Sequence, residues 1–106
     1  MMMPLQSQAQ FEELLVQDSK ANKGGAVVYF TASWCGACKR LDLNAIQESN
    51  KDVRWYKCDV DENKYTLGYC GLKSIPSFAF IKDGKFLGKF QSSNTEAVTE
   101  LIQGSF

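Results

Sequence analysis

"AVVYFTASWCGACK", residues 26–39, decides the fold, because a strand ends and a helix begins within it. Residues 26–31 form a continuous apolar and β-rich run that follows a Gly-Gly pair. Such a run is typical of a strand that is buried on both faces of a sheet. Cys35 and Cys38 follow at the end of this strand, with the spacing C-x-x-C. A pair with this spacing has three interpretations: a redox dithiol, half of a metal site, or two core thiols. The rest of the sequence has to decide between them.

The hydrophobic periodicity of the remaining chain switches repeatedly between the helical and the strand period. Two capping boxes mark helix starts, and Asp-Gly between two apolar runs predicts a hairpin. In the first half of the chain the pattern predicts a strand over residues 2–6, a helix that starts at Ser7–Gln10 and ends near Asn22–Gly25, a strand over 26–31 and a helix over 35–49. In the second half it predicts a strand over 53–60, a short helix over 61–69, and strands over 77–82 and 85–90 joined at Asp83-Gly84. A last helix starts at Ser93–Glu96 and ends near Gly104.

Strands that alternate with helices imply parallel strand pairs with helical crossovers, and the final hairpin adds an antiparallel edge. We therefore expect an α/β fold with a central mixed β-sheet of four to five strands, flanked by helices on both faces. A chain of 106 residues fits one domain, over residues 1–106.

The composition excludes several classes of function. Hydrophobic residues make up 44% and charged residues 23%, which is typical of a globular chain. Twelve basic residues balance twelve acidic ones, so we expect neither nucleic acid nor a membrane as partner. The N-terminal residues have no basic region followed by an apolar run, so no signal peptide is predicted and we expect a cytoplasmic protein. The absence of His excludes histidine-based catalysis and histidine-containing zinc sites.

The position of the cysteine pair favours redox chemistry. The first turn of a helix has unpaired N–H groups, and these stabilise a thiolate. Cys35 comes first and gains most from them, whereas we expect Cys38 to be one turn deeper and more buried. An accessible thiolate then attacks a target disulfide, and the sheltered neighbour resolves the mixed disulfide. Gly36 leaves room for a substrate chain to approach.

Two other interpretations of the cysteines need weighing. Two structural core thiols would not require Trp34, Gly36 and a strand–helix junction around them. A zinc site would recruit Cys58 and Cys70, but these two cysteines do not form a second close pair. We expect Cys58 to be a core thiol in the middle of a strand. We expect Cys70 to be an ordinary loop cysteine, with intermolecular disulfide formation or oxidation as the alternatives.

Four short motifs carry a resemblance to a known family. They are "WCGACK" at 34–39, "DVDEN" at 59–63, "SIPSF" at 74–78 and "KDGK" at 82–85. Together, with the predicted element order over essentially all 106 residues, they resemble the thioredoxin family, whose active-site motif usually reads WCGPCK. The resemblance implies a thioredoxin fold.

The resemblance also implies roles for individual residues. Cys35 is the attacking thiolate and Cys38 the resolving thiol, and Trp34 is the flat apolar flank of the site. Pro76 follows a cis peptide bond and faces the dithiol, which leaves the backbone of Ile75 free to pair with an extended substrate segment. The predicted substrate-binding residues are Trp34, Gly36, Ala37, Ile75 and Pro76.

The activity that follows from the resemblance is that of a thiol–disulfide oxidoreductase that reduces protein disulfides. The implied partners are disulfide-bearing target proteins and a flavoprotein thioredoxin reductase that uses NADPH. The chain has no Gly-rich dinucleotide loop, so we expect no cofactor and no metal besides the redox-active cysteines, and a monomer. The alternatives are a catalytically weakened binding or scaffold module with this fold, and a specialised disulfide oxidant or isomerase.

Three positions depart from the family pattern. Tyr29 stands where the family usually has a buried Asp that helps to deprotonate the resolving thiol, whereas the neighbouring Lys57 is retained. We expect either slower resolution by Cys38 or a proton that leaves through water or Lys57, so Tyr29 and Lys57 are the candidate proton-transfer residues. Ala37 replaces the usual proline, which we expect to make the redox potential less reducing. Gln91 replaces a glycine beside the substrate groove, where its side chain narrows the groove or adds hydrogen bonds.

Overall fold

The computed structural model describes residues 2–21 and 25–106. Its elements, in chain order, are β1 (Met3–Pro4), α1 (Gln8–Ala21), β2 (Ala26–Thr31), the 3₁₀ helix η1 (Cys38–Arg40), α2 (Leu43–Glu48), β3 (Arg54–Asp59), α3 (Thr66–Tyr69), β4 (Ser77–Lys82), β5 (Lys85–Gln91) and α4 (Thr95–Ser105). The strand predicted over 2–6 and the helix predicted over 61–69 exist, but both are shorter than predicted.

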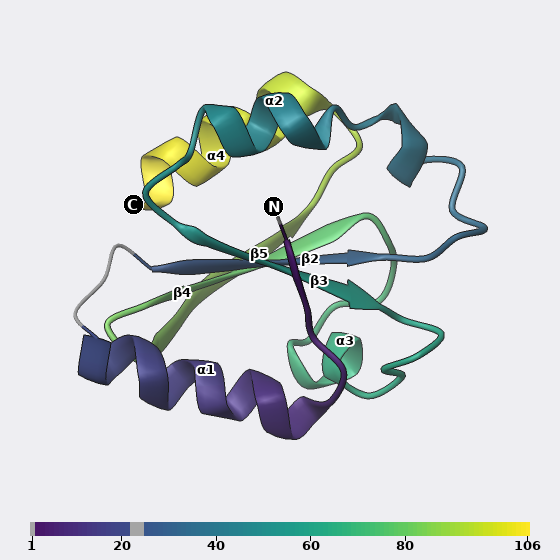
Figure 1. Cartoon of the computed structure of the whole chain (residues 1–106). Helices are drawn as coiled ribbons and strands as arrows, with labels where there is room; N and C mark the ends of the chain where they lie inside the picture. The colour runs from purple at the N-terminus through teal and green to yellow at the C-terminus, as the bar shows by residue number, and fades with distance from the viewer. Residues whose placement is uncertain (1, 22–24) are drawn as a thin grey trace.

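The strands that the structure describes form one mixed sheet in the order β1-β3-β2-β4-β5 (Figure 1). β3 pairs in parallel with both β1 and β2, whereas β4 pairs antiparallel with β2 and β5. Helices α1 and α3 lie on one face of the sheet, and α2 and α4 lie on the other (Figure 1). The predicted α/β fold with a mixed sheet and helices on both faces is confirmed.

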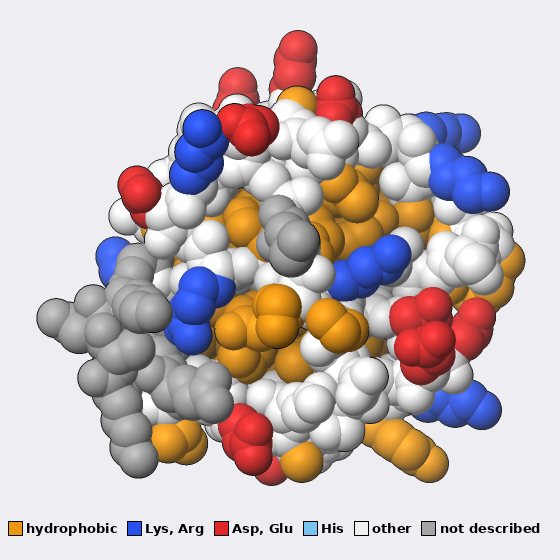
Figure 2. Space-filling model, in the orientation of Figure 1, with side chains coloured by type: hydrophobic (Ala, Val, Ile, Leu, Met, Phe, Trp, Pro, Cys, Tyr) orange, Lys and Arg blue, Asp and Glu red, His pale blue; other side chains and the backbone are white. Residues whose placement is uncertain are grey.

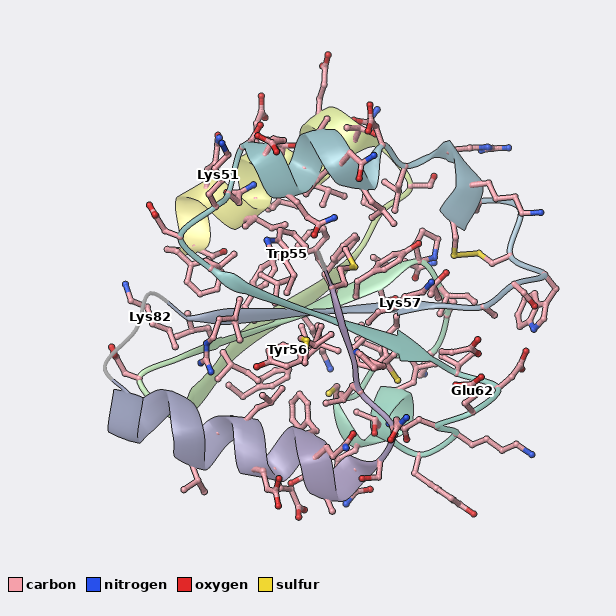
Figure 3. The ribbon with its side chains drawn as sticks, in the orientation of Figure 1. Lys51, Trp55, Tyr56, Lys57, Glu62 and Lys82 are labelled. Carbon is pink, nitrogen blue, oxygen red and sulfur yellow. A yellow bond between two sulfur atoms is a disulfide. The ribbon has the colours of Figure 1, made fainter. Side chains whose placement is uncertain are left out.

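The core lies on both faces of the sheet because side chains alternate along each strand. Val28 packs in one cluster with Phe11 of α1, and Tyr29 packs in the other with Ile102 of α4. Every residue of β2 is buried, as the continuous apolar run predicts for a central strand. Figure 3 shows the same alternation on β3, where Trp55 and Tyr56 point to opposite faces. Burial of each large apolar side chain contributes about 1.5–3 kcal/mol to stability.

Both predicted helix starts exist, although the cap of the last helix differs from the prediction. Ser7 Oγ accepts a hydrogen bond of 3.2 Å from the N–H of Gln10, as expected for the start of α1. At the start of α4 the capping side chain belongs to Asn94, whose Oδ1 accepts from the N–H of Ala97 at 2.9 Å, so Ser93 is not the cap. The predicted end of the first helix falls partly on residues 22–24, outside the described residues.

The predicted hairpin at Asp83-Gly84 is confirmed. Asp83 has a φ of 55° and Gly84 a φ of 75°, and these two residues connect β4 to β5. Two consecutive positive φ angles are typical of the tight turn whose twist suits an antiparallel hairpin. The hairpin places the C-terminal end of β5 beside the start of β4, where Gln91 pairs with Ser77.

The prediction of one continuous helix over 35–49 is wrong. A turn and the 3₁₀ helix η1 follow Cys35, and Leu41 is extended, with a ψ of 133°. Asp42 then caps a separate helix, α2, because its Oδ1 accepts a hydrogen bond of 3.1 Å from the N–H of Ala45. The cysteine pair therefore lies in a turn and a single turn of 3₁₀ helix.

The face that carries β1 is apolar in its middle. Figure 2 shows hydrophobic side chains gathered there, with Lys and Arg side chains beside them. A hollow of about 460 Å³ on this side includes Met3, Lys51, Trp55 and Tyr56 in its lining, and its lining shares no residue with the disulfide cluster described below. Within residues 2–21 and 25–106, no helix is both long and apolar enough to cross a bilayer.

Candidate active site

The two cysteines of the C-x-x-C motif are joined by a disulfide bond. Their Cα atoms lie 5.3 Å apart, and the bond is the yellow link between sulfur atoms in Figure 3. Cys35 follows the end of β2, and Cys38 begins η1. Their exposed fractions are 4% and 6%, so the expectation that Cys38 is clearly the more sheltered of the two is wrong in this disulfide form. The disulfide bond joins the two side chains, and both belong to the same buried cluster.

A backbone N–H group supports the sulfur of Cys35. The N–H of Cys38 donates a hydrogen bond to Cys35 Sγ over 3.1 Å. The sequence predicted that unpaired N–H groups at the start of a long helix would stabilise this sulfur. The helix is interrupted, and among the described residues one N–H, that of Cys38, donates to it. A hydrogen bond to the charged form of a group favours that form, and the N–H of Cys38 already points at the sulfur where a thiolate would form.

Small and aliphatic side chains surround the disulfide. The cysteines cluster with Ala32, and Ala37, Val60 and Ile75 pack against this cluster. Gly36 is open to solvent on its outer side, since a Cβ atom built there would meet no other atom within 4 Å. There is therefore open space beside the disulfide at Gly36, and the approach of a substrate chain there stays a prediction.

Trp34 flanks the site as an exposed side chain that one hydrogen bond holds in place. Its exposed fraction is 66%, and its Nε1 donates to Oδ2 of Asp61 at 2.8 Å. The N–H of Asp61 in turn donates to Oδ1 of Asp59 at 2.9 Å. Sequence reasoning missed the contribution of Asp61, although it lies within the motif at 59–63 that supported the family resemblance.

The loop before β4 contains the predicted cis peptide bond, between Ile75 and Pro76. The side chain of Ile75 packs against the disulfide cluster. Among the residues that the structure describes, no backbone group hydrogen-bonds to the N–H or the C=O of Ile75. These two backbone groups therefore have free hydrogen-bonding capacity, and pairing of Ile75 with a substrate segment stays a prediction.

Side chains on both sides of this loop fix its start. The Ser77 hydroxyl donates to the C=O of Ser74, and the Ser74 hydroxyl donates to Oε1 of Gln91 at 2.6 Å. Gln91, at the end of β5, is also the strand partner of Ser77. The sequence left open whether the Gln91 side chain narrows the groove or adds hydrogen bonds. The structure shows an added hydrogen bond, the one from Ser74.

Tyr29 is buried in the core and is not a base at neutral pH. Its exposed fraction is 2%, its ring stacks on Phe78 with 5.2 Å between centroids, and its hydroxyl donates to Thr31 Oγ1 at 3.2 Å. Burial raises the pKa of Tyr29 above its ordinary value of 10.0, and the hydrogen bond with Thr31 offsets part of this shift. Lys57 is exposed and is the parallel strand partner of Tyr29, so the two candidate proton-transfer residues lie side by side on neighbouring strands.

The two remaining cysteines lie together in a different part of the core. Cys58 and Cys70 are 0% and 5% exposed and belong to the cluster on the α1 face of the sheet. Cys58 is a core thiol, as predicted. Cys70 lies in the turn that ends α3, as predicted for a loop cysteine, but its side chain is buried in the core, which the sequence did not indicate. Burial raises the pKa of each thiol to about 12. The four cysteines thus occupy two separate clusters, which does not fit a shared zinc site.

Comparison with known proteins gives the family. The family model described as Thioredoxin matches residues 3–104. Thioredoxin of Oryctolagus cuniculus is 35% identical over 104 residues, which cover 96% of each chain. The crystal structure of mitochondrial thioredoxin 3 from Saccharomyces cerevisiae, in its oxidized form, superposes with a TM-score of 0.84 at 31% identity, over 97% of this chain and 94% of that one.

A further solved structure with a TM-score of 0.84 and 30% identity covers 97% of this chain and 94% of its own chain. It is described as the structural basis of the thiol resolving mechanism in yeast mitochondrial 1-Cys peroxiredoxin via glutathione/thioredoxin systems. These matches and the Cys35–Cys38 disulfide define a thiol–disulfide oxidoreductase. The chain belongs to the thioredoxin family, whose members work through their own cysteine pair. The matches favour neither a scaffold module nor a specialised oxidant or isomerase.

Proposed function

We propose that this protein reduces disulfides in other proteins, with Cys35 as the attacking residue and Cys38 as the resolving residue. The observation that carries the proposal is the hydrogen bond from the N–H of Cys38 to Cys35 Sγ, because it supports a thiolate at the first sulfur. The thiolate is the nucleophile in disulfide exchange.

The reaction has two exchange steps. The thiolate of Cys35 attacks one sulfur of the target disulfide, a bond forms between Cys35 Sγ and that sulfur, and the other target sulfur leaves as a thiolate and takes a proton from water. Cys38 then loses its proton and attacks Cys35 Sγ, which releases the second target thiol. The target gains two electrons and two protons, and the Cys35–Cys38 disulfide is the oxidised product.

Five residues around the sulfurs bind the substrate in this proposal. Gly36 and Ala37 let the target backbone approach, Trp34 provides a flat apolar flank, and Ile75 pairs with an extended target segment before Pro76. The unpaired backbone groups of Ile75 and the open space at Gly36 support these roles. The proton of Cys38 leaves through water or Lys57, because the raised pKa of Tyr29 keeps its phenol protonated.

The proposed partners follow from the need to reduce the disulfide again. A flavoprotein thioredoxin reductase returns two electrons from NADPH to the cysteine pair, and the chain itself binds neither a cofactor nor a metal. We place the protein in the cytoplasm as a monomer with one domain over residues 1–106. A mitochondrial location is the competing assignment, because a relative from yeast carries that description.

Insulin reduction with NADPH and a thioredoxin reductase tests the proposal. Fast NADPH oxidation that depends on the protein supports both the activity and the reductase. Turnover only with dithiothreitol supports the activity but identifies a different electron donor. A folded protein that is inactive with either reductant contradicts the proposed function.

A further inference from the structure

Two hydrogen bonds and one strand pairing link Ser74, Ser77 and Gln91 in a closed ring around the start of the loop that carries Ile75 and Pro76. Gln91 and Ser77 are strand partners, the Ser77 hydroxyl donates to the C=O of Ser74, and the Ser74 hydroxyl donates to Gln91 Oε1 at 2.6 Å. The ring joins the C-terminal end of β5 to the residue directly before Ile75. A distance of 2.6 Å is within the normal range for an O–H···O hydrogen bond.

The two ends of this ring differ in burial. Ser77 is 0% exposed, whereas Ser74 and Gln91 are exposed. An exposed Gln side chain ordinarily samples several rotamers, and ordering it has an entropic cost. Here a buried strand partner fixes the backbone of Gln91, so its side chain reaches Ser74 from a rigid position.

The chemistry of the carboxamide adds a second consequence. Oε1 of Gln91 is occupied by Ser74, and Nε2 has no hydrogen-bond partner among the described residues. The side chain therefore uses its acceptor inside the protein and keeps two N–H donors for solvent or for a bound chain. Ser74 directly precedes Ile75, whose side chain packs against the cluster around the sulfurs, so the bond between Ser74 and Gln91 acts on the site through Ile75.

We propose that Ser74 and Gln91 are positioning residues for polypeptide substrates. Their hydrogen bond holds the backbone of Ile75 in the geometry in which its free N–H and C=O pair with an extended segment. This inference rests on the proposed function. Because a small disulfide without a polypeptide backbone does not use that pairing, the bond between Ser74 and Gln91 discriminates between the two kinds of substrate.

The test compares two substrates across matched variants. Ser74→Ala and Gln91→Leu each remove one side of the bond, and Ser74→Thr retains the hydroxyl. Gln103→Leu on α4 is the control, since the hydrogen bond that the Gln103 side chain makes within residues 2–21 and 25–106 is an exposed one of 3.4 Å to the C=O of Ser49. The substrates are insulin and the small aromatic disulfide 5,5′-dithiobis(2-nitrobenzoate), with kcat and KM measured for both at a fixed excess of reductant.

We expect kcat/KM for insulin to fall about three- to tenfold in Ser74→Ala and Gln91→Leu, mainly through KM, as for the loss of one neutral hydrogen bond. The double variant should lose no more kcat/KM for insulin than either single variant. The kcat/KM values of Ser74→Thr and Gln103→Leu for insulin should equal that of wild type. With the small disulfide, all variants should match wild type.

The outcomes separate the two proposals. Unchanged insulin kinetics in both single variants, or an equal loss with both substrates, would overturn the positioning role. Additive losses in the double variant would also overturn it, because independent residues share no bond. A wild-type protein that reduces neither substrate would contradict the proposed function itself. Melting temperatures of all variants identify any loss that arises from unfolding.

Discussion

The backbone N–H of Cys38 donates a hydrogen bond to Sγ of Cys35 across 3.1 Å. In the proposed mechanism, the residue that completes the reaction therefore also stabilises the sulfur that starts it. The stabilising group belongs to the backbone, so replacing the Cys38 side chain leaves it in place. The attack and the resolution can for this reason be separated by a single substitution.

We predict that Asp61→Leu lowers kcat/KM for protein disulfides, because Trp34 loses the 2.8 Å hydrogen bond that fixes its exposed ring. The free energy of unfolding should change by no more than about 0.5 kcal/mol, as for most surface substitutions. Asp61→Asn retains an acceptor for Nε1 and is the matched control. Steady-state insulin kinetics and urea unfolding measure both effects. Equal kinetics for Asp61→Leu and Asp61→Asn would show that this bond has no part in substrate binding.

We predict that Tyr29→Asp shortens the lifetime of the mixed disulfide between Cys35 and a target, because a carboxylate at position 29 accepts a proton where the protonated phenol does not. Acid quenching followed by mass spectrometry measures this lifetime. Tyr29→Phe is the control, since it removes the hydroxyl that donates to Thr31 without adding a base, and its lifetime should equal that of wild type. If Tyr29→Asp folds and the lifetime is not shorter, the missing carboxylate does not limit resolution.

We predict that the stability of the oxidised protein falls as the pH rises above about 9, because Cys58 and Cys70 are buried thiols. An unfolded thiol loses its proton near 9.0, whereas in the folded protein the pKa of each is raised to about 12. Between these values the unfolded state binds fewer protons, so the free energy of unfolding decreases with pH, by about 1.4 kcal/mol per unit for each thiol.

The matched variant is Cys58→Ala/Cys70→Ala, which lacks both thiols and keeps Tyr29. Urea unfolding from about pH 8 to about pH 10.5 should give a shallower slope for this variant than for wild type. Identical slopes would mean that the two thiols ionise as freely in the folded protein as in the unfolded chain.

Part of the fold follows directly from local sequence. The apolar run at 26–31 predicts β2 with its observed bounds, because a strand buried on both faces needs no alternation of polar residues. Asp83-Gly84 predicts the hairpin because both residues tolerate positive φ. These features depend on neighbours in the chain, so periodicity and turn chemistry are sufficient to find them.

The error over residues 35–49 has a local cause that the sequence contains. The apolar spacing of this segment fits a helix, but Asp42 is a helix cap and Leu41 is extended before it. An N-cap residue in the middle of a helical pattern indicates a second start, and the periodicity outweighed it in the prediction.

Other features of the site depend on contacts between distant segments. The bond from Trp34 to Asp61 spans 27 residues, and the bond from Ser74 to Gln91 spans 17. The burial of Cys70 likewise depends on how α3 packs with α1 against the sheet. No local pattern reports such contacts, so the sequence identified the cysteines and the loop at Pro76 but not the residues that hold them in place.

Trapping with Cys38→Ser tests the division of roles between the two cysteines most directly. This variant keeps the N–H that stabilises Cys35 Sγ and lacks the resolving thiol. Incubated in reduced form with a peptide disulfide, it should accumulate one peptide per protein, and peptide mapping should place the bond on Cys35. A Cys35→Ser protein should form no such adduct. An adduct on Cys58 or Cys70, or a Cys38→Ser protein that forms no adduct, would contradict the assignment of Cys35 as the attacking sulfur.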